Sequence, residues 1–371
     1  MLDDVVRLFL PDLFPGARSI EAWSVKLTRD ADLHIDDEFS GDLLEKIREG
    51  LRRRRTGPPS RFLYDIAMPP SLLERLRRHL GLKREDLIPG GRYHNFNDFF
   101  SFPRIGEAGA EYPPMPPLPV PRLDPGRPIV ELLDEGDILV SLPYQSFDGV
   151  IRMIDEAADD PDVTSIAMTI YRVAENSRVV NGLIAAALNG KKVTVFVEVK
   201  ARFDEEANFR RAAELEGAGA RVIYSMPGMK VHAKILVIER STSEGQRRYG
   251  LFSTGNFNEK TALLYVDHIV MTADARLLDE GAMIFEYLRG ERAKITSRHL
   301  MVAPFNLRKR LLAVIDREID HARNGSEGET ILKVNSLEDE GMIMKLYGSF
   351  ENQVGRICRL TREKSSLPVK R

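Results

Sequence analysis

Residues 137–171 read DILVSLPYQSFDGVIRMIDEAADDPDVTSIAMTIY. The apolar runs at the two ends of this segment are typical of buried strands, and residues 147–160 between them have the spacing of an amphipathic helix. Two parallel strands need a long crossover, usually a helix, to bring the chain back to the same side of the sheet. The segment therefore predicts a strand–helix–strand unit of an α/β fold.

The same alternation continues along the chain. Ser177 and Gly190 bound a predicted helix, because serine caps the first turn of helices and glycine commonly follows the last. A further helix and two strands are expected at 204–219, 191–199 and 221–225. Three strands without helices between them follow at 234–239, 248–254 and 267–273. We expect a largely parallel, mixed sheet with helices on both faces, and an antiparallel edge made by these later strands.

The segments on either side of this region differ from it in composition and in the periodicity of their apolar residues. Residues 112–128, YPPMPPLPVPRLDPGRP, are rich in proline and predict an extended linker between domains. A helix at 305–323 and a strand at 331–337 indicate the beginning of another α/β unit. Residues 355–371 show neither the helix nor the strand periodicity, and we predict a frayed tail there.

Composition excludes several classes of protein. The 371 residues are 43% hydrophobic and 30% charged, as in soluble globular proteins. No apolar run approaches the length of about 18 residues that a membrane span needs, and the acidic start MLDDVVRLFLPDLFPG is unlike a signal peptide. Cys358 is the only cysteine, which excludes an internal disulfide framework and a multi-cysteine zinc site. These features favour a cytoplasmic protein.

Anion binding, if present, must come from a local cluster of basic groups. The chain has 54 Lys and Arg against 56 Asp and Glu, so its formal net charge is only -2. It contains neither the glycine-rich phosphate loop followed by Lys and Ser or Thr, nor a dinucleotide-binding glycine motif. An ordinary nucleotide site of either type is therefore not predicted.

The segment GMKVHAKILVIE, residues 228–239, places His232 and Lys234 two positions apart at the start of a predicted strand. Alternation would put both side chains on one face of that strand. An imidazole can accept a phosphoryl group, and an ammonium group offsets charge on the phosphoryl oxygens. The alternative is a surface strand that carries an unrelated histidine and lysine.

A small-residue turn follows one strand later, in FSTGNFNEKT, residues 252–261. A His-x-Lys pair followed by a turn that ends in an asparagine, here Asn256, resembles one half of the phospholipase D superfamily. In that superfamily two such halves face each other across one site. The acidic residue expected five positions after the lysine is Glu239, where the superfamily usually has Asp.

Two arginines are predicted at the carboxyl ends of neighbouring strands. Arg172 lies in TIYRVAENSR and Arg202 in VKARFDEEANF. Ligands bind at this edge of open α/β sheets, and the planar guanidinium group suits phosphate oxygens. The alternatives are a local salt bridge from Arg202 to Asp204 or Glu205, and an ordinary edge arginine at position 172.

Taken together, the motifs resemble polyphosphate kinase of the long, phosphohistidine-forming type. The resemblance runs from about residue 2 to about residue 347, and its motifs occur in the family's order. They are LTRDADLHIDDE, RRRRTGPPSRF, PYQSFD, TIYRVAENSR, VKARFDEEANF, GMKVHAK, STGNFNEKTALLY and PFNLRKRLLAVIDREID.

The resemblance implies an α/β fold of three parts. Residues 1–118 would be the C-terminal part of an α+β head domain, and residues 119–300 a first catalytic domain with a phospholipase D-like mixed sheet and helices on both faces. Residues 301–371 would be the incomplete start of a second phospholipase D-like domain with a divergent tail.

The resemblance also implies roles for three residues of the predicted site. His232 matches the histidine that becomes phosphorylated. Lys234 matches the lysine of the histidine motif, and Asn256 matches the turn asparagine. Both would orient phosphate oxygens during reversible transfer of the ATP γ-phosphoryl group to inorganic polyphosphate.

Three further residues are implied to bind the nucleotide and its metal. Tyr265 matches the tyrosine that stacks on adenine, although by itself it is typical of a half-buried strand tyrosine. Arg172 and Arg202 match the pair at the family's Mg²⁺ and phosphate site. Because a guanidinium group has no lone pair for a cation, we expect these arginines to hold phosphate oxygens beside Mg²⁺.

The sequence departs from the family pattern at several points. Ala167 and Leu263 stand where the family has a lysine and an arginine, so two phosphate-facing cations are expected to be missing. The chain starts inside the head domain, and the pattern stops after Tyr347. We therefore expect a chain truncated at both ends that carries one half of a two-half site.

Three functions remain open from the sequence. One is an active polyphosphate kinase core with ATP, ADP, inorganic polyphosphate and Mg²⁺ as ligands. Another is an inactive remnant that acts at most as a polyphosphate-binding or dimerisation module. The last is a phospholipase D-like hydrolase or nuclease that pairs two copies of the half-site. The first reading implies no nucleic-acid partner and no membrane span, with a homodimer as one assembly state and a cytoplasmic or membrane-peripheral location.

Overall fold

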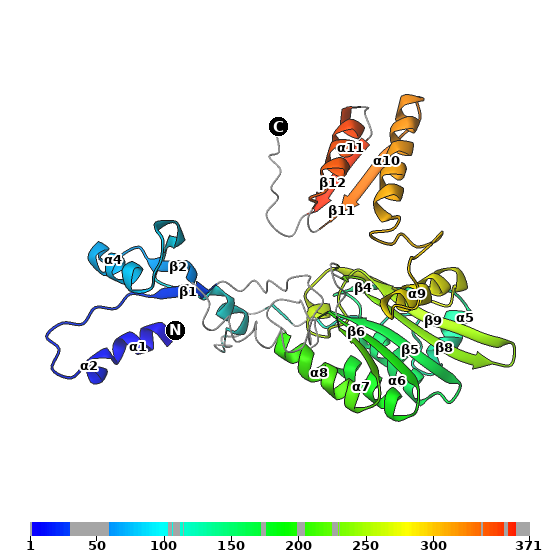
Figure 1. Ribbon diagram of the computed structural model, residues 1–371, viewed down its shortest axis with the longest axis horizontal. Helices are drawn as coiled ribbons and strands as arrows, with labels where there is room; N and C mark the ends of the chain where they lie inside the picture. The colour runs from blue at the N-terminus through cyan, green and yellow to red at the C-terminus, as the bar shows by residue number, and fades with distance from the viewer. Residues whose placement is uncertain are drawn as a thin grey trace. The chain divides into compact units, whose positions relative to one another are not determined.

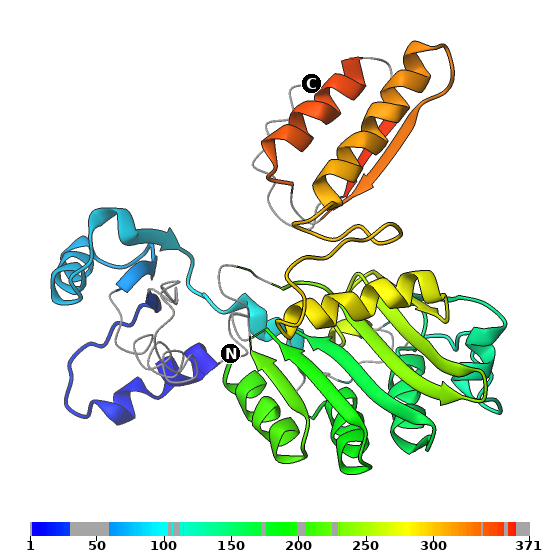
Figure 2. The ribbon, with the colours of Figure 1, turned by 45° about the vertical axis from the view of Figure 1, so that its right-hand side comes forward.

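A computed structural model describes residues 2–29, 59–102, 106, 112–113, 115–171, 176–198, 205–224, 229, 231–334, 337–351 and 355–360. The chain divides into two compact units, residues 1–114 and 115–371. Figures 1 and 2 show the ribbon from two directions. Arg172 and Arg202 lie outside the described residues, as do residues 361–371.

The first unit combines a small sheet with short helices. Its strands are β1 (Val25–Arg29), β2 (Pro59–Asp65) and β3 (Leu87–Gly90), and its helices are α1 (Leu2–Leu8), α2 (Leu10–Leu13) and α4 (Pro70–His79). Two 3₁₀ turns are also present, η1 (Arg84–Asp86) and η2 (Phe96–Ser101). β2 lies between its neighbours, antiparallel to β1 and parallel to β3. Phe62 of β2 is buried, so the α+β unit has a core of its own.

The second unit is built on a seven-stranded sheet. In chain order its strands are β4 (Ile138–Leu142), β5 (Val163–Ile170), β6 (Lys192–Val197), β7 (Arg221–Tyr224), β8 (Ile235–Thr242), β9 (Gly245–Ser253) and β10 (Asp267–Thr272). Their order across the sheet is β4-β10-β9-β8-β5-β6-β7. Each strand expected from the sequence in this region is therefore present.

The expectation of a largely parallel sheet is wrong. Only β5 with β6 and β6 with β7 pair in parallel. β8 lies antiparallel to β5 at the centre of the sheet, and β9, β10 and β4 continue the antiparallel pairing outward. The physical reason is the connections: β8 and β9 are joined by a tight turn, which can only return the chain antiparallel. The antiparallel strands thus form more than half of the sheet rather than one edge.

Helices cover both faces of this sheet, as predicted. α6 (Asp148–Asp159), α7 (Arg178–Leu188) and α8 (Glu205–Gly217) lie side by side on one face, and α9 (Ala275–Leu288) lies on the other (Figures 1 and 2). α5 (Ile129–Asp134) contacts α6. The predicted cap of α7 is confirmed, because Ser177 Oγ accepts a hydrogen bond from the Val180 N–H and Gly190 follows the helix with a positive φ of 82°.

The residues beneath α9 explain why this helix packs closely against the sheet. Leu278 and Phe285 of α9 pack with Val237 of β8 in one buried cluster. Gly250 of β9 lies under the helix, and a Cβ there would be 2.6 Å from Leu278 Cδ2 and would also overlap the backbone oxygen of Leu236. The absence of a side chain at position 250 is therefore what lets α9 approach the sheet.

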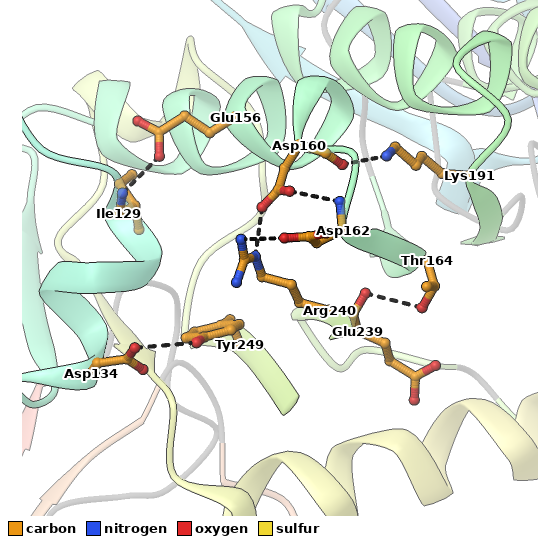
Figure 3. A network of polar contacts seen from close by, with 10 residues as sticks. All are labelled: Ile129, Asp134, Glu156, Asp160, Asp162, Thr164, Lys191, Glu239, Arg240 and Tyr249. Atoms are coloured by element: carbon orange, nitrogen blue, oxygen red, sulfur yellow. Dashed lines mark hydrogen bonds and ion pairs between the residues drawn. The ribbon is translucent and has the colours of Figure 1, made fainter. Parts of the chain in front are cut away.

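Polar side chains fasten the edge of the sheet where β5 begins (Figure 3). Arg240 of β8 donates to the carboxylates of Asp160 and Asp162, at 2.7 and 2.9 Å. The hydroxyl of buried Tyr249 lies 3.4 Å from Asp134 at the end of α5. Arg240 thus joins β8 to the residues that lead into β5, and Tyr249 joins β9 to the end of α5. The Arg240 contacts lie at the end of the strands opposite to His232.

The C-terminal residues form a small α/β arrangement. Its elements are α10 (Leu307–Arg323), β11 (Glu329–Lys333), α11 (Glu340–Glu351) and β12 (Gly355–Leu360). Ile315, Ile319, Met342 and Leu346 form its buried cluster. The prediction of a frayed tail from residue 355 is wrong for residues 355–360, which pair in parallel with β11. The pairing partner lies more than 20 residues earlier, so local periodicity did not reveal this strand.

A buried carboxylate joins α9 to the segment that follows it. Glu280 is only 7% exposed and accepts hydrogen bonds from the backbone N–H groups of Arg298, His299 and Leu300, at 2.6–3.1 Å. Burial opposes ionisation of Glu280, but these N–H groups hold its pKa below the usual range. None of the described helices is both long enough and apolar enough to cross a membrane.

We expect Gly250→Ala to destabilise the second unit by about 3 kcal/mol or more, because the added methyl group clashes with backbone that cannot move aside. Gly217→Ala is the matched control, since no atom lies within 4 Å of the corresponding Cβ at the end of α8. Chemical denaturation measures both variants. Equal stability of the two variants would contradict the close approach of α9.

Glu280 predicts a stability change in acid. A carboxyl whose pKa is lower in the folded state stabilises it above the unfolded pKa of about 4.3, and this contribution is lost as the pH falls through the folded pKa. We expect Glu280→Gln to cost about 1.5–3 kcal/mol at neutral pH and to flatten the loss of stability below about pH 4. Urea denaturation across pH 3–7 tests this. The exposed Glu244→Gln is the control, and a parallel pH profile for the wild type and Glu280→Gln would contradict the assignment.

Candidate functional site

One edge of the seven-stranded sheet collects four of the residues singled out by the sequence, namely His232, Lys234, Asn256 and Tyr265. The registers place the carboxyl ends of β4, β5, β6, β7 and β9 at this edge, together with the starts of β8 and β10. Tyr171 follows β5, residues 231–234 lead into β8, and the turn that contains Asn256 follows β9. Ligands commonly bind at such an edge of an α/β sheet.

His232 and Lys234 lie directly before β8 rather than inside it. The His232 side chain is exposed, whereas Lys234 is only 7% exposed. Lys234 Nζ donates a hydrogen bond of 2.6 Å to the backbone oxygen of His232, so its alkyl chain folds back toward the histidine. An exposed imidazole next to a buried ammonium is an arrangement that can attract an anion and attack it.

Tyr171 contacts both members of this pair. Its ring meets the His232 ring nearly perpendicularly, with ring centroids 4.9 Å apart and an interplanar angle of 87°. Lys234 Nζ lies over the same tyrosine ring, 5.2 Å from its centroid. Edge-to-face ring pairs and cation–π contacts are both favourable geometries.

Two polar side chains fix the backbone on either side of His232. The buried Thr169 hydroxyl donates to the Ala233 oxygen at 2.8 Å and accepts from the Ile235 N–H at 3.0 Å. Glu198, which follows β6 and is 1% exposed, accepts from the Val231 N–H at 3.1 Å. The histidine segment is therefore attached to β5, the neighbouring strand, and to the residue that follows β6, one strand further across the sheet.

The turn after β9 is shaped by short polar contacts. Ser253 Oγ accepts from the Gly255 N–H at 3.0 Å, and the Thr254 hydroxyl donates to Asp267 Oδ1 at 2.9 Å. A Cβ at position 255 would overlap the Asp267 carboxylate, so the turn needs glycine there. Within the part of the chain that the structure describes, Asn256 Oδ1 is buried and has no hydrogen-bond partner. The carbonyl oxygen of the Asn256 side chain can thus accept a further hydrogen bond at this edge.

Glu259 connects this turn to the start of α7. Its Oε1 accepts from the Ser177 hydroxyl at 3.0 Å and from the Val179 N–H at 3.2 Å. A carboxylate at a helix N-terminus is stabilised by the helix dipole. Glu259, three residues after Asn256, therefore ties the asparagine turn to the first residues of α7.

Tyr265 lies at the same edge, immediately before β10. It is half-buried, and its N–H donates to the Thr261 oxygen at the 3₁₀ turn η3 (Thr261–Leu263). None of the described contacts joins Tyr265 to His232. Glu239, by contrast, lies five residues along β8 and pairs with Arg248 and the Ser165 hydroxyl, which is a structural role away from the edge.

Three sequence models of polyphosphate kinase domains match nearly the whole chain. The middle-domain model matches residues 1–102, the model of C-terminal domain 1 matches 128–294, and the model of C-terminal domain 2 matches 300–363. The chain belongs to the polyphosphate kinase family. The third match also corrects the expectation that the resemblance stops near residue 347.

Individual relatives agree with this assignment. The chain is 42% identical to the polyphosphate kinase of Escherichia coli K12 over 360 residues, which are 95% of this chain and 52% of that relative. The polyphosphate kinase of Yersinia pestis is 42% identical over 353 residues, 94% of this chain and 51% of the relative. The crystal structure of polyphosphate kinase from Porphyromonas gingivalis superposes with a TM-score of 0.80 at 36% identity, covering 98% of this chain and 52% of that one. The chain thus spans about half the length of the relatives that it matches.

Ala167 and Leu263, the two positions where the sequence leads us to expect a departure from the family pattern, lie in different environments. Ala167 is inside β5 opposite Val237 and packs against the core beneath α9, so this position does not face His232. Leu263 is 58% exposed on η3, close in sequence to Tyr265. Position 167 therefore lies beside the core, and position 263 lies at the surface.

Sequence reasoning missed four residues that shape this edge, namely Thr169, Tyr171, Glu198 and Glu259. Thr169 and Tyr171 belong to the quoted motif TIYRVAENSR, and Glu259 to STGNFNEKTALLY. The candidate residues chosen from these two motifs were Arg172, Asn256 and Tyr265. The sequence signal that could have indicated Thr169, Tyr171, Glu198 and Glu259 was their position at or near the ends of predicted strands.

We expect Thr169→Val to lower stability by about 1–3 kcal/mol, because the isosteric side chain leaves the Ile235 N–H and the Ala233 oxygen without their partner. Thr169→Ser keeps the hydroxyl and is the matched control, with a smaller loss. Urea denaturation compares the two variants. A valine variant at least as stable as the serine variant would show that the hydroxyl does not hold this segment.

Proposed function

We propose that this chain carries the phosphohistidine half-site of a polyphosphate kinase, with His232 as the residue that is phosphorylated. The observation that supports this proposal is the exposed imidazole of His232 beside the buried ammonium group of Lys234, in a backbone segment fixed by Thr169 and Glu198. The substrates would be ATP and inorganic polyphosphate.

The reaction divides into two transfers. An imidazole nitrogen of His232 attacks the ATP γ-phosphorus, the N–P bond forms, and the bond to the β,γ-bridging oxygen breaks, so that ADP leaves with that electron pair. A terminal oxygen of polyphosphate then attacks the same phosphorus and the N–P bond breaks, which returns the neutral imidazole. Both transfers are reversible, and covalent catalysis of this kind replaces one difficult step with two easier ones.

Phosphoryl transfer depends mainly on positioning and positive charge. Lys234 would offset charge on the transferring oxygens, and the side-chain NH₂ group of Asn256 would donate hydrogen bonds that orient them. Tyr265 would stack on the adenine ring, and Arg172 and Arg202 would hold phosphate oxygens. These roles follow from the family resemblance, and those of Lys234, Asn256 and Tyr265 also from the sheet edge that these residues share.

The described residues do not supply a site for Mg²⁺ by themselves. No group of three or more His, Cys, Asp or Glu side chains among them is arranged to hold a metal ion. Arg172 and Arg202 cannot ligate a cation, because a guanidinium group has no lone pair. In this proposal Mg²⁺ accompanies ATP as part of the substrate.

A second function is a binding or dimerisation module without catalysis. The observation that favours it is that Leu263, where the family resemblance leads us to expect an arginine, is exposed on η3. A site that works by charge loses strength when a cation is missing. A homodimer and a cytoplasmic or membrane-peripheral location fit either function.

Labelling the purified chain with γ-³²P-ATP and Mg²⁺ tests the proposal. We expect an acid-labile, base-stable label on the protein that is lost in His232→Gln, because phosphohistidine is hydrolysed in acid. His268→Gln, at an exposed histidine on β10, is the matched control and should keep the label. Label that persists in His232→Gln would contradict the assignment of the nucleophile. A folded wild-type chain that binds polyphosphate but takes no label would establish the binding module instead.

A further inference from the structure

We propose that Tyr171 is the positioning residue of this site. Its aromatic ring, rather than its hydroxyl group, would hold the His232 imidazole and the Lys234 ammonium group in one fixed relative orientation. This inference rests on the proposed function, since it assigns the residue that prepares His232 for attack.

The ring contacts limit the orientations open to His232. The histidine side chain is exposed, and solvent by itself would leave its ring free to rotate about both side-chain bonds. The Tyr171 ring contacts the imidazole nearly perpendicularly, at a centroid distance of 4.9 Å and an angle of 87°, and blocks the space on one side of it. Edge-to-face pairs have a preferred geometry, so this contact favours one orientation of the His232 ring over the others.

The same ring also fixes the position of the cation. Lys234 Nζ lies 5.2 Å from the Tyr171 ring centroid and 2.6 Å from the His232 backbone oxygen. Burial of all but 7% of Lys234 removes water that would otherwise solvate its charge, and the π face of tyrosine partly replaces that water. The ammonium group is therefore held at a set place relative to the imidazole.

Tyr171 is itself anchored to the segment that it positions. It follows Ile170, the last residue of β5, and β5 pairs with β8, the strand that begins directly after Lys234. The Thr169 hydroxyl, two residues before Tyr171, bonds the backbone at Ala233 and Ile235. The tyrosine and the histidine therefore lie on two chain segments that cannot move independently.

Orientation matters because phosphoryl transfer needs the attacking nitrogen in line with the leaving oxygen. A displacement of about 1 Å can lower a rate by about 100-fold. Loss of the ring should thus slow phosphorylation of His232 while leaving ATP affinity largely intact, because the ring acts through its contacts with His232 and Lys234.

The test is the single-turnover rate of ³²P transfer from ATP to the full chain, measured across ATP concentrations. We expect Tyr171→Leu to lower the limiting rate about 10- to 100-fold, with the half-saturating ATP concentration unchanged within about threefold. Tyr171→Phe keeps the ring and should restore the rate to within about threefold of wild type. Tyr347→Leu makes the same chemical change at a half-exposed site on α11 and is the matched control.

Two results would overturn the proposal. One is a Tyr171→Leu rate within threefold of wild type, and the other is a Tyr171→Phe rate as low as that of Tyr171→Leu, which would assign the effect to the hydroxyl. Thermal melting checks that the variants are folded. Tyr171→Met, which fills similar space without a π face, replaces the leucine variant if that variant does not fold.

Nuclear magnetic resonance separates this proposal from the proposed function. If the wild-type chain takes no label, the function fails, but the positioning can still be measured. We expect nuclear Overhauser contacts between the Tyr171 and His232 rings and side-chain couplings of a single His232 rotamer in wild type and Tyr171→Phe, with averaged couplings in Tyr171→Leu. Averaged couplings in the wild type would overturn the positioning role whatever the activity.

Discussion

The antiparallel pairing of β5 with β8 is the constraint on which the rest of the second unit depends. It joins the parallel half of the sheet to the antiparallel half, and it brings the end of β5 next to the segment that leads into β8. Thr169 reinforces the pairing with two side-chain hydrogen bonds at the point where the regular ladder ends. The contacts of Tyr171 with His232 and Lys234 follow from this junction.

Charge at the edge is concentrated rather than abundant. The chain as a whole is nearly neutral, yet the edge presents the His232 imidazole beside a lysine with most of its surface buried. A buried ammonium interacts more strongly with an anion than an exposed one, because less water screens it. Near-neutral overall charge is therefore compatible with a strong local anion site, provided that the backbone keeps these groups in place.

Much of the second unit could be predicted from the sequence, because its elements obey local rules. The amphipathic spacing of α6, the Ser177 cap of α7 and the apolar runs of β5 and β6 each act within a few residues. The direction of β8 and the pairing of β12 could not be read in this way, because they depend on partners far along the chain. The candidate site shows the same division. His232, Lys234 and Asn256 belong to recognisable motifs, whereas the contact of Tyr171 with both His232 and Lys234 exists only once β5 and β8 are paired.

The carboxylate of Glu280 has a consequence for how the chain comes apart. It accepts the N–H groups of residues 298–300, and the Leu300 oxygen in turn accepts from Asn306 and from Arg310 of α10. A continuous series of hydrogen bonds therefore runs from α9 to the helix that begins the C-terminal elements. Protonation of one buried group would interrupt this series at its first member. Acid would then weaken the attachment of the C-terminal elements to the seven-stranded sheet, and these elements would be the first to lose their connection to α9.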